Sequence, residues 1–343
     1  NALQGDVTQS PIRGGLEWAA KQPNSTFTLG ATIRYDETTD YLYEISCQIY
    51  ENRCEISSEE LVRVKFRPKK DKGRGKESGR IKIFRTDPCT KTQPDIVARL
   101  YNEKQGTPRQ SGRSTSILFQ LYGQRYRSEI TEGVQCAINA FRGIFILDPI
   151  PAHMRGFSPL SDTLDPDAGN IAGVVAALNA ESVKLFERMI EKYIRHLPER
   201  EIRRVYAERV GKFETDAMLY CEETWGSEEG KLPVVDARGM SDGTLRFLAI
   251  LIALLTRPSG SLLVVEEVDN GLHPSRSSLL LRMLQDIGTE RRVDVLVTTH
   301  NPALLDEMGL TKRNDSGIRV LPDGRPLEIT VETSGENLEQ TDV

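Results

Sequence analysis

The sequence of 343 residues predicts an α/β protein with a mostly parallel core sheet, an antiparallel β-rich lobe and a helical subdomain. Alternating runs that contain Tyr and Ile near the amino end are typical of antiparallel strands. Apolar residues at three- and four-residue spacing in the middle indicate helices, and short, wholly apolar runs near the carboxyl end indicate strands buried on both faces. We therefore expect three segments, residues 1–150, 151–235 and 236–343.

The first segment is expected to form the β-rich lobe. Phe27–Tyr35 and Tyr41–Tyr50 alternate as strands do, and the polar turn Asp36–Asp40 joins them. The Gly- and Lys-rich stretch Arg67–Gly79 has almost no apolar residue, so we expect an exposed loop there, with the sheet resuming at Arg80–Arg85. Further apolar runs follow at residues 114–122 and 143–147.

The second segment is expected to contain a linker and a helical subdomain. Asp148–Asn170 is dense in Pro, Gly and Asp, which marks a boundary between lobes. From Ile171 to about Val210 apolar residues recur at helical spacing, and Pro198 interrupts that run.

Composition excludes several classes of protein. No run approaches the length of a membrane span, no secretory signal pattern is present, and we expect no membrane partner. The five cysteines are odd in number and scattered, without a C-x-x-C pair, which argues against a disulfide framework and a zinc site and predicts a reducing, cytoplasmic location.

A basic segment lies within this mildly acidic chain, whose net charge is −5. Between Leu61 and Arg80, nine Lys and Arg residues face two acidic residues, a local charge of +7. Such a segment can attract a phosphate backbone, so DNA is one candidate partner, through Lys69, Lys70, Lys72 and Arg74. A solvated loop explains the same charges equally well, and few aromatic residues are present to stack on bases.

The third segment carries the residues with recognisable chemistry. Ser241-Asp242-Gly243 precedes the strongly apolar helix expected at Leu245–Leu255, with Ser241 as the N-cap. A helix start with N–H groups, a hydroxyl and a glycine can hold a phosphate. The alternative is a well-capped buried helix with no ligand.

The apolar run Leu262–Val265 is expected to be a buried parallel strand, and it ends in Glu266 and Glu267. Ligands bind at the carboxyl ends of such strands. One carboxylate there can hold Mg²⁺ and the other can deprotonate an attacking water. A solvated strand end is the alternative, although the tight turn that follows, which begins at Asp269-Asn270, weakens it.

A second buried strand is expected at Val293–Thr299, and it ends in His300. If the intervening helix makes a right-handed crossover, as nearly all do, His300 lies at the same edge as Glu266 and Glu267. This coincidence favours a functional histidine over a structural one.

Three motifs in this order, MSDGTLRFLAI (240–250), LLVVEEVDNGLHP (262–274) and VLVTTHNPALLD (295–306), resemble the ABC-type ATPase heads of the SMC, RecF and OLD proteins. The sequence is most similar to their compact, AAA-labelled bacterial relatives, many of which act in phage defence. The motifs occupy about 70 residues, and fainter similarity extends through Asp148–Asn170 and the helices that follow.

The resemblance implies roles for these residues and implies ATP and Mg²⁺ as ligands. Ser241–Gly243 corresponds to the signature that contacts the γ-phosphate of ATP bound to the opposite subunit. Glu266 corresponds to the Walker B acid that holds Mg²⁺, and Glu267 to the catalytic base. Asp269-Asn270 corresponds to the D-loop and His300 to the switch histidine. Glu266 and the Asp-Gly-Thr of the signature differ from the Asp and Gly-Gly-Gln of transporters, so a transporter subunit is disfavoured.

The phosphate loop that such an ATPase needs, G-x-x-x-x-G-K-[ST], does not occur in these residues. Gly106–Ser114 is a near-match with Arg in place of Lys, and we expect a flexible loop there. Asn1-Ala2-Leu3 resembles the helix that follows a phosphate loop, so we expect that loop upstream of Asn1. Without it, an ATP-free dimerisation module would be the better interpretation.

The resemblance therefore predicts an ATPase that dimerises head to head, or forms a higher homo-oligomer, and gates a separate nuclease or toxin in anti-phage defence. The alternative is a RecF- or SMC-like DNA-binding scaffold for repair or chromosome maintenance.

Overall fold

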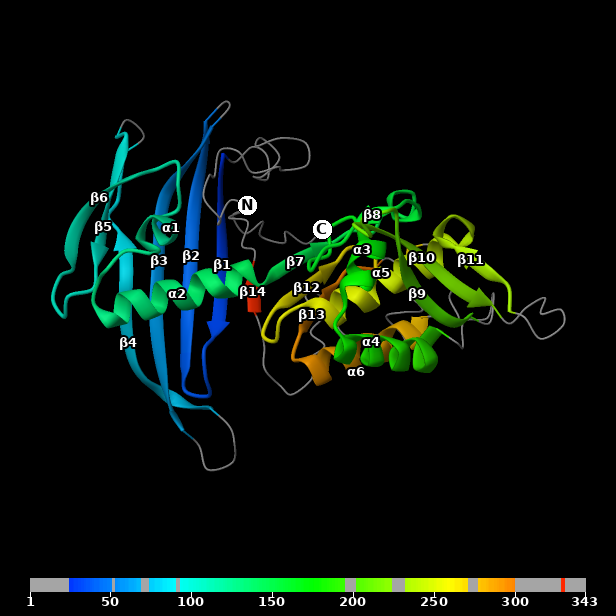
Figure 1. Cartoon of the computed structure of the whole chain (residues 1–343). Helices are drawn as coiled ribbons and strands as arrows, with labels where there is room; N and C mark the ends of the chain where they lie inside the picture. Colours follow the sequence, from blue (N-terminus) through cyan, green and yellow to red (C-terminus); the bar gives the residue numbers. More distant parts are fainter. Residues whose placement is uncertain are drawn as a thin grey trace, which may run out of the picture. The chain divides into compact units, whose positions relative to one another are not determined.

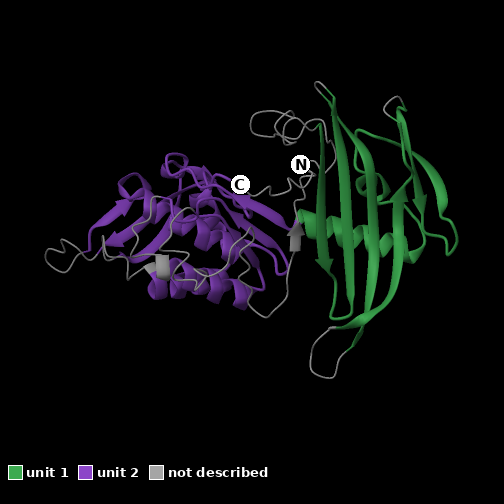
Figure 2. Ribbon diagram, turned by 180° about the vertical axis from the view of Figure 1, so that it is seen from behind, with its two compact units in different colours: residues 1–142, 325–343 green, residues 143–324 purple. Residues whose placement is uncertain are grey.

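The computed structural model describes residues 25–50, 53–68, 74–90, 93–194, 202–223, 232–270, 277–299 and 328–330. The chain forms two compact units, one of residues 1–142 and 325–343 and the other of residues 143–324 (Figure 2). The α/β class that the sequence predicts is confirmed, because both units combine sheets with helices.

Unit 1 is built on a seven-stranded antiparallel sheet in the order β14-β1-β2-β3-β4-β5-β6 (Figure 1). Six neighbouring strands follow one another along the chain, so local hairpins build most of the sheet. The expected hairpin of the first two strands is confirmed, with the Tyr35 N–H donating to the Thr39 carbonyl at 3.0 Å in its turn. The strands are β1 (Thr26–Arg34), β2 (Thr39–Tyr50), β3 (Arg53–Pro68), β4 (Arg74–Thr86), β5 (Asp95–Leu100), β6 (Thr107–Gly112) and β14 (Glu328–Thr330).

Two helices, α1 (Ile117–Leu121) and α2 (Ser128–Arg142), complete unit 1. In Figure 1, α2 crosses the sheet on one face, and it contacts β2, β3 and β4. The rings of Tyr43 and Phe141 meet edge to face, with centroids 5.1 Å apart. Burial of this apolar face holds the helix on the sheet.

Two stretches of unit 1 that were expected to be loops contain strands in their described residues; residues 69–73 of the first stretch lie outside the description. Residues 74–79 of the basic stretch belong to β4, where Lys65 of β3 pairs with Gly79, and Thr107–Gly112 of the near-match forms β6 on β5. Strand pairing is made by backbone hydrogen bonds and needs no apolar side chains. A strand can therefore extend beyond the hydrophobic core into a polar stretch, which the composition does not reveal. Gly106, with φ of +91°, provides the turn into β6.

Unit 2 contains the parallel sheet expected from the carboxyl-terminal runs, in the order β13-β12-β7. The strands are β7 (Ile144–Leu147), β12 (Leu262–Val265) and β13 (Asp294–Val297). They pair in parallel without a register shift, since Val265 of β12 lies opposite Leu147 on one side and Val297 on the other. The run at 144–147, grouped with the amino-terminal segment by composition, thus pairs with the carboxyl-terminal strands.

A second, antiparallel sheet in unit 2 has β10 (Asp216–Glu223) at its centre. It pairs with β8 (Ser158–Pro159), β9 (Ile202–Val210) and β11 (Val234–Asp236). The helical pattern predicted to run to Val210 is confirmed for α3 (Ile171–Ala177) and α4 (Ala180–Met189) and wrong for β9. Pairing with the apolar β10 overrides the local spacing of β9, as context commonly does for strands.

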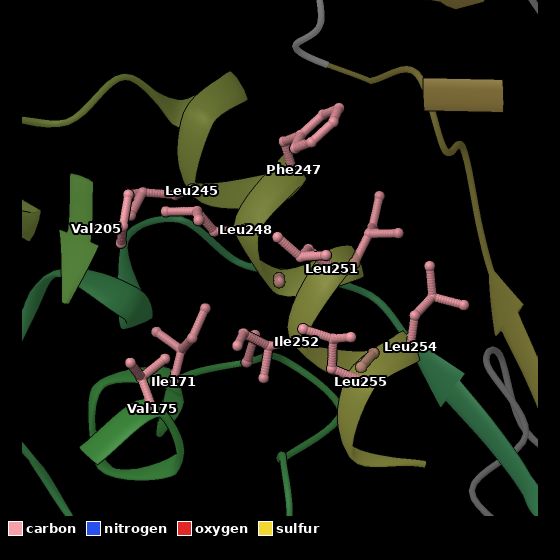
Figure 3. Close-up of a cluster of buried hydrophobic side chains, with 14 of the residues drawn as sticks. Ile171, Val175, Val205, Leu245, Phe247, Leu248, Leu251, Ile252, Leu254 and Leu255 are labelled. Atoms are coloured by element: carbon pink, nitrogen blue, oxygen red, sulfur yellow. The ribbon is translucent and has the colours of Figure 1, made fainter. Parts of the chain in front are cut away.

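The core of unit 2 surrounds helix α5 (Asp242–Thr256). Every residue from Phe247 to Leu255 is buried, as the apolar sequence predicts. Ile171 and Val175 of α3 and Val205 of β9 surround its side chains (Figure 3). On its other sides α5 contacts β12, α4 and α6 (Ser277–Arg291), so its position is fixed by packing all around.

Two expectations about the whole chain can be compared with the structure. None of the five cysteines forms a disulfide, as their spacing predicted. Within the described ranges, no helix is both long enough and apolar enough to cross a membrane.

Glu59 is a buried carboxylate that ties β3 to α1 in unit 1. It accepts hydrogen bonds from the N–H groups of Ile117 (2.6 Å) and Leu118 (2.9 Å) and from the Tyr43 hydroxyl (2.9 Å). Burial raises the pKa of Glu59 to about 7, although these donors oppose the shift. An unfolded Glu has a lower pKa, about 4.3. As the pH rises from about 4.3 to about 7, the unfolded chain loses its proton before the folded one does, so the free energy of unfolding decreases over this range.

Glu59→Ala should destabilise unit 1 by about 3 kcal/mol, because three buried donors lose their acceptor. The loss should be larger at pH 5 than at pH 8. Hydrogen exchange of β2 and β3 amides measures it locally. The control is Glu60→Ala, on the opposite face, where a partly exposed pair with Lys82 (3.1 Å) contributes about 0.5 kcal/mol. Equal effects of the two variants would contradict the role of Glu59.

Candidate functional site

The parallel sheet of unit 2 brings three strand ends to one edge. Because β7, β12 and β13 run in the same direction without a register shift, the residues that follow them are neighbours: Asp148 after β7, Glu266 after β12 and Thr298 after β13. Asp148 was not among the predicted site residues. The sequence pattern that could have identified Asp148 is the one that identified Glu266: an acidic residue directly after a wholly apolar run.

Glu266 and Glu267 begin a tight turn, and both side chains are exposed. Glu267 has φ of +46°, a left-handed conformation that costs a non-glycine residue about 1 kcal/mol or more. Asn270 closes the turn in two ways, donating its N–H to the Glu267 carbonyl (2.8 Å) and its Nδ2 to Glu267 Oε2 (3.2 Å). The turn thereby orients the carboxylate of Glu267.

The end of β13 holds this turn in place. Thr298 Oγ1 accepts a hydrogen bond from the Glu267 N–H at 2.9 Å, and the Thr298 carbonyl accepts one from the Val268 N–H at 3.0 Å. The next residue, Thr299, donates its hydroxyl to Asp269 Oδ1. The two threonines were predicted only as the end of a strand, and their polar side chains after an apolar run are the signal for this second role.

The start of α5 has the predicted cap. Ser241 Oγ accepts a hydrogen bond from the Thr244 N–H at 3.2 Å, and the Ser241 carbonyl accepts one from the Leu245 N–H at 3.0 Å. Ser241 and Asp242 are exposed, whereas Gly243 is buried. The helix start thus presents a hydroxyl and a carboxylate to solvent, from Ser241 and Asp242.

An arginine that was not predicted contacts this helix start. Arg155 ends the 3₁₀ turn His153–Arg155, and its Nη2 donates to Asp242 Oδ1 in an ion pair. The side chain of Arg155 is 27% exposed and that of Asp242 is 67% exposed. Arg155 lies within Asp148–Asn170, which the composition indicated only as a boundary between lobes. One arginine in that segment forms no sequence motif, so the sequence did not predict its role.

The structure therefore groups Glu266, Glu267 and Asp269-Asn270 in one turn, and places Ser241–Gly243 on a different element. His300 lies outside the described residues, directly after Thr299. Lys69, Lys70 and Lys72 also lie outside the described residues, and only the backbone of Arg74 is described, in β4.

Across the ranges that the structure describes, no group of three or more His, Cys, Asp and Glu side chains could hold a metal ion. This finding is compatible with the predicted magnesium ligand, because Mg²⁺ on a nucleotide is bound by one or two carboxylates together with phosphates and water. Glu266 is exposed directly after β12, where it can reach such an ion.

Residues 163–306 match the family described as "AAA domain, putative AbiEii toxin, Type IV TA system". The match includes α5, the Glu266–Asn270 turn and β13. It confirms the resemblance to AAA-labelled relatives and supports ATPase activity. No curated protein matches the chain.

Solved structures with low sequence identity also match. The SmcHead bound to the C-winged helix domain of ScpA is 13% identical, with a TM-score of 0.35, and the match covers 78% of this chain and 68% of that one. The Pyrococcus furiosus Smc head domain with an extended coiled coil, bound to the C-terminal domain of ScpA, is 11% identical, with a TM-score of 0.31, and the match covers 79% and 72%.

Thr298→Val should lower ATP hydrolysis about fivefold, because losing the acceptor for the Glu267 N–H costs about 1 kcal/mol. ATP affinity should change less than about twofold, since the variant leaves Ser241–Gly243 and Glu266 unchanged. Single-turnover hydrolysis and equilibrium binding with the full-length gene product measure the two quantities. Thr289→Val, at an exposed position of α6, is the control. Wild-type hydrolysis by Thr298→Val would contradict the role of the hydrogen bond.

Proposed function

We propose that the protein hydrolyses ATP in a head-to-head dimer, and that closure and reopening of this dimer gate a separate nuclease or toxin in defence against bacteriophage. The observation that carries the proposal is the Glu266–Asn270 turn. Two adjacent exposed carboxylates follow a buried parallel strand, and the second is oriented by Asn270 and Thr298. The turn lies within the residues that match the AAA family.

The two carboxylates have different roles in this proposal. Glu266 binds the Mg²⁺ that accompanies ATP, and when bound this ion neutralises charge on the phosphate oxygens. Glu267 accepts the proton of the attacking water as a general base. The hydrogen bond from Asn270 occupies Oε2 of Glu267, so Oε1 can receive that proton.

The other half of each site comes from the second subunit. The Ser241 hydroxyl and the amino end of α5 bind the γ-phosphate of ATP held by the partner subunit, because the helix dipole favours an anion there. Asp269 and Asn270 lie at the interface between subunits, and His300 contacts the γ-phosphate. Each ATP thus bridges two copies, and its hydrolysis removes the bridge.

The proposal requires a phosphate loop, which the 343 residues do not contain. The experiments therefore use the full-length gene product. A gene without G-K-[ST] before Asn1 would contradict hydrolysis and favour an ATP-free dimerisation module.

Glu267→Gln tests the proposed function. The amide cannot accept the proton, so turnover should fall at least about 100-fold, while ATP binding persists and the closed dimer accumulates. Mass measurements with and without ATP report the dimer, and phosphate release reports turnover. The matched control is Glu290→Gln on α6, where Glu290 pairs with Arg188 at 3.0 Å on the surface. Unchanged turnover in Glu267→Gln would refute the assignment of the base.

A further inference from the structure

Arg155 makes a converging set of contacts with the segment that leads into α5. Its Nη1 donates hydrogen bonds to three backbone carbonyls, those of Ala237 (3.0 Å), Arg238 (2.8 Å) and Met240 (2.8 Å). Its Nη2 donates to the carboxylate of Asp242, the first residue of the helix. One guanidinium therefore joins the turn before the helix to the helix itself.

The carbonyls converge because Ala237–Gly239 forms a 3₁₀ turn, which begins at the cap Asp236. Asp236 Oδ1 accepts the Arg238 N–H at 3.0 Å, and the Met240 N–H donates to the Ala237 carbonyl at 3.3 Å. Main-chain oxygens at this turn need donors from elsewhere. The planar guanidinium, with five N–H groups in a fixed geometry, can serve several acceptors at once, whereas the single ammonium of lysine cannot match that geometry.

Charge gives Arg155 a second effect. Asp242 places a carboxylate beside the helix start that binds the γ-phosphate in the proposed function, and two anions there would repel each other. The ion pair with Arg155 offsets that charge. The body of α5 is held by burial on all sides, so Ser241–Gly243 and the turn before it are the part of this element that Arg155 can direct.

We propose that Arg155 is a positioning residue for Ser241–Gly243, which aims the helix start of one subunit at the ATP of the other. This inference rests on the proposed function. Arg155 acts through its contacts with the main chain and with Asp242. It holds the residues on either side of Ser241, the carbonyl of Met240 and the carboxylate of Asp242, and it neutralises Asp242. Its loss therefore disables the site of the partner subunit and leaves its own subunit's Glu266 and Glu267 intact.

Mixed dimers test this directly. Arg155→Ala alone should lower hydrolysis about 100-fold, because a displacement of about 1 Å at a reacting group has that effect, while ATP binding to the monomer is unchanged. Mixed with Glu267→Gln subunits before ATP is added, it should regain about a quarter of wild-type single-turnover hydrolysis, since half of random dimers are mixed and each contains one intact site. Mixed with Ser241→Ala subunits it should regain none, because every site then lacks a working helix start.

The control is Arg188→Ala, which breaks an exposed ion pair elsewhere in unit 2 and should hydrolyse ATP like the wild type. Recovery with Glu267→Gln also shows that Arg155→Ala is folded. If Arg155→Ala regained hydrolysis with both Glu267→Gln and Ser241→Ala subunits, or with neither of them, the inference would be overturned. Failure of the proposed function is distinguishable, because the wild type would then neither hydrolyse ATP nor dimerise with it.

Discussion

The parallel, in-register pairing of β12 with β7 and β13 is the constraint on which the rest of the candidate site depends. Parallel strands end at one edge, so the residues after them meet there although they lie far apart in the chain. The Thr298 hydroxyl can accept from the Glu267 N–H only because β13 stops level with β12. A shift of one residue that brought Val297 to this place would remove the acceptor, because valine has no side-chain oxygen.

The two halves of the proposed site are held by different kinds of interaction. The Glu266–Asn270 turn is strained, exposed and held by hydrogen bonds, which suits a group that must act on a reacting water. Helix α5 is held by apolar packing on all sides, which fixes its position and makes it rigid. Its exposed end is directed by a single arginine from Asp148–Asn170, so this segment contributes to the site through Arg155 as well as through Asp148.

The parts that sequence predicts well are those where one physical signal dominates. The apolar run before Glu266 and the capped apolar helix after Ser241 are governed by burial and local capping, and both were found. The strand at Ile202–Val210 was mistaken for helix because the spacing of its own apolar residues is ambiguous, and that spacing alone does not reveal the hairpin with the next strand, β10. Arg155 and Thr298 could not be singled out, since their importance arises from backbone groups more than 30 residues away.

The central claim is that one ATP is shared by the Glu266–Asn270 turn of one subunit and the helix start of another. Hydrogen exchange of the full-length protein with saturating ATP, at several protein concentrations, tests it most directly. The account predicts that protection of the Asp242 and Gly243 amides rises with protein concentration, while protection at Glu266 and Glu267 is already present in the monomer. Protection of both segments that is independent of protein concentration would contradict the sharing of ATP between subunits.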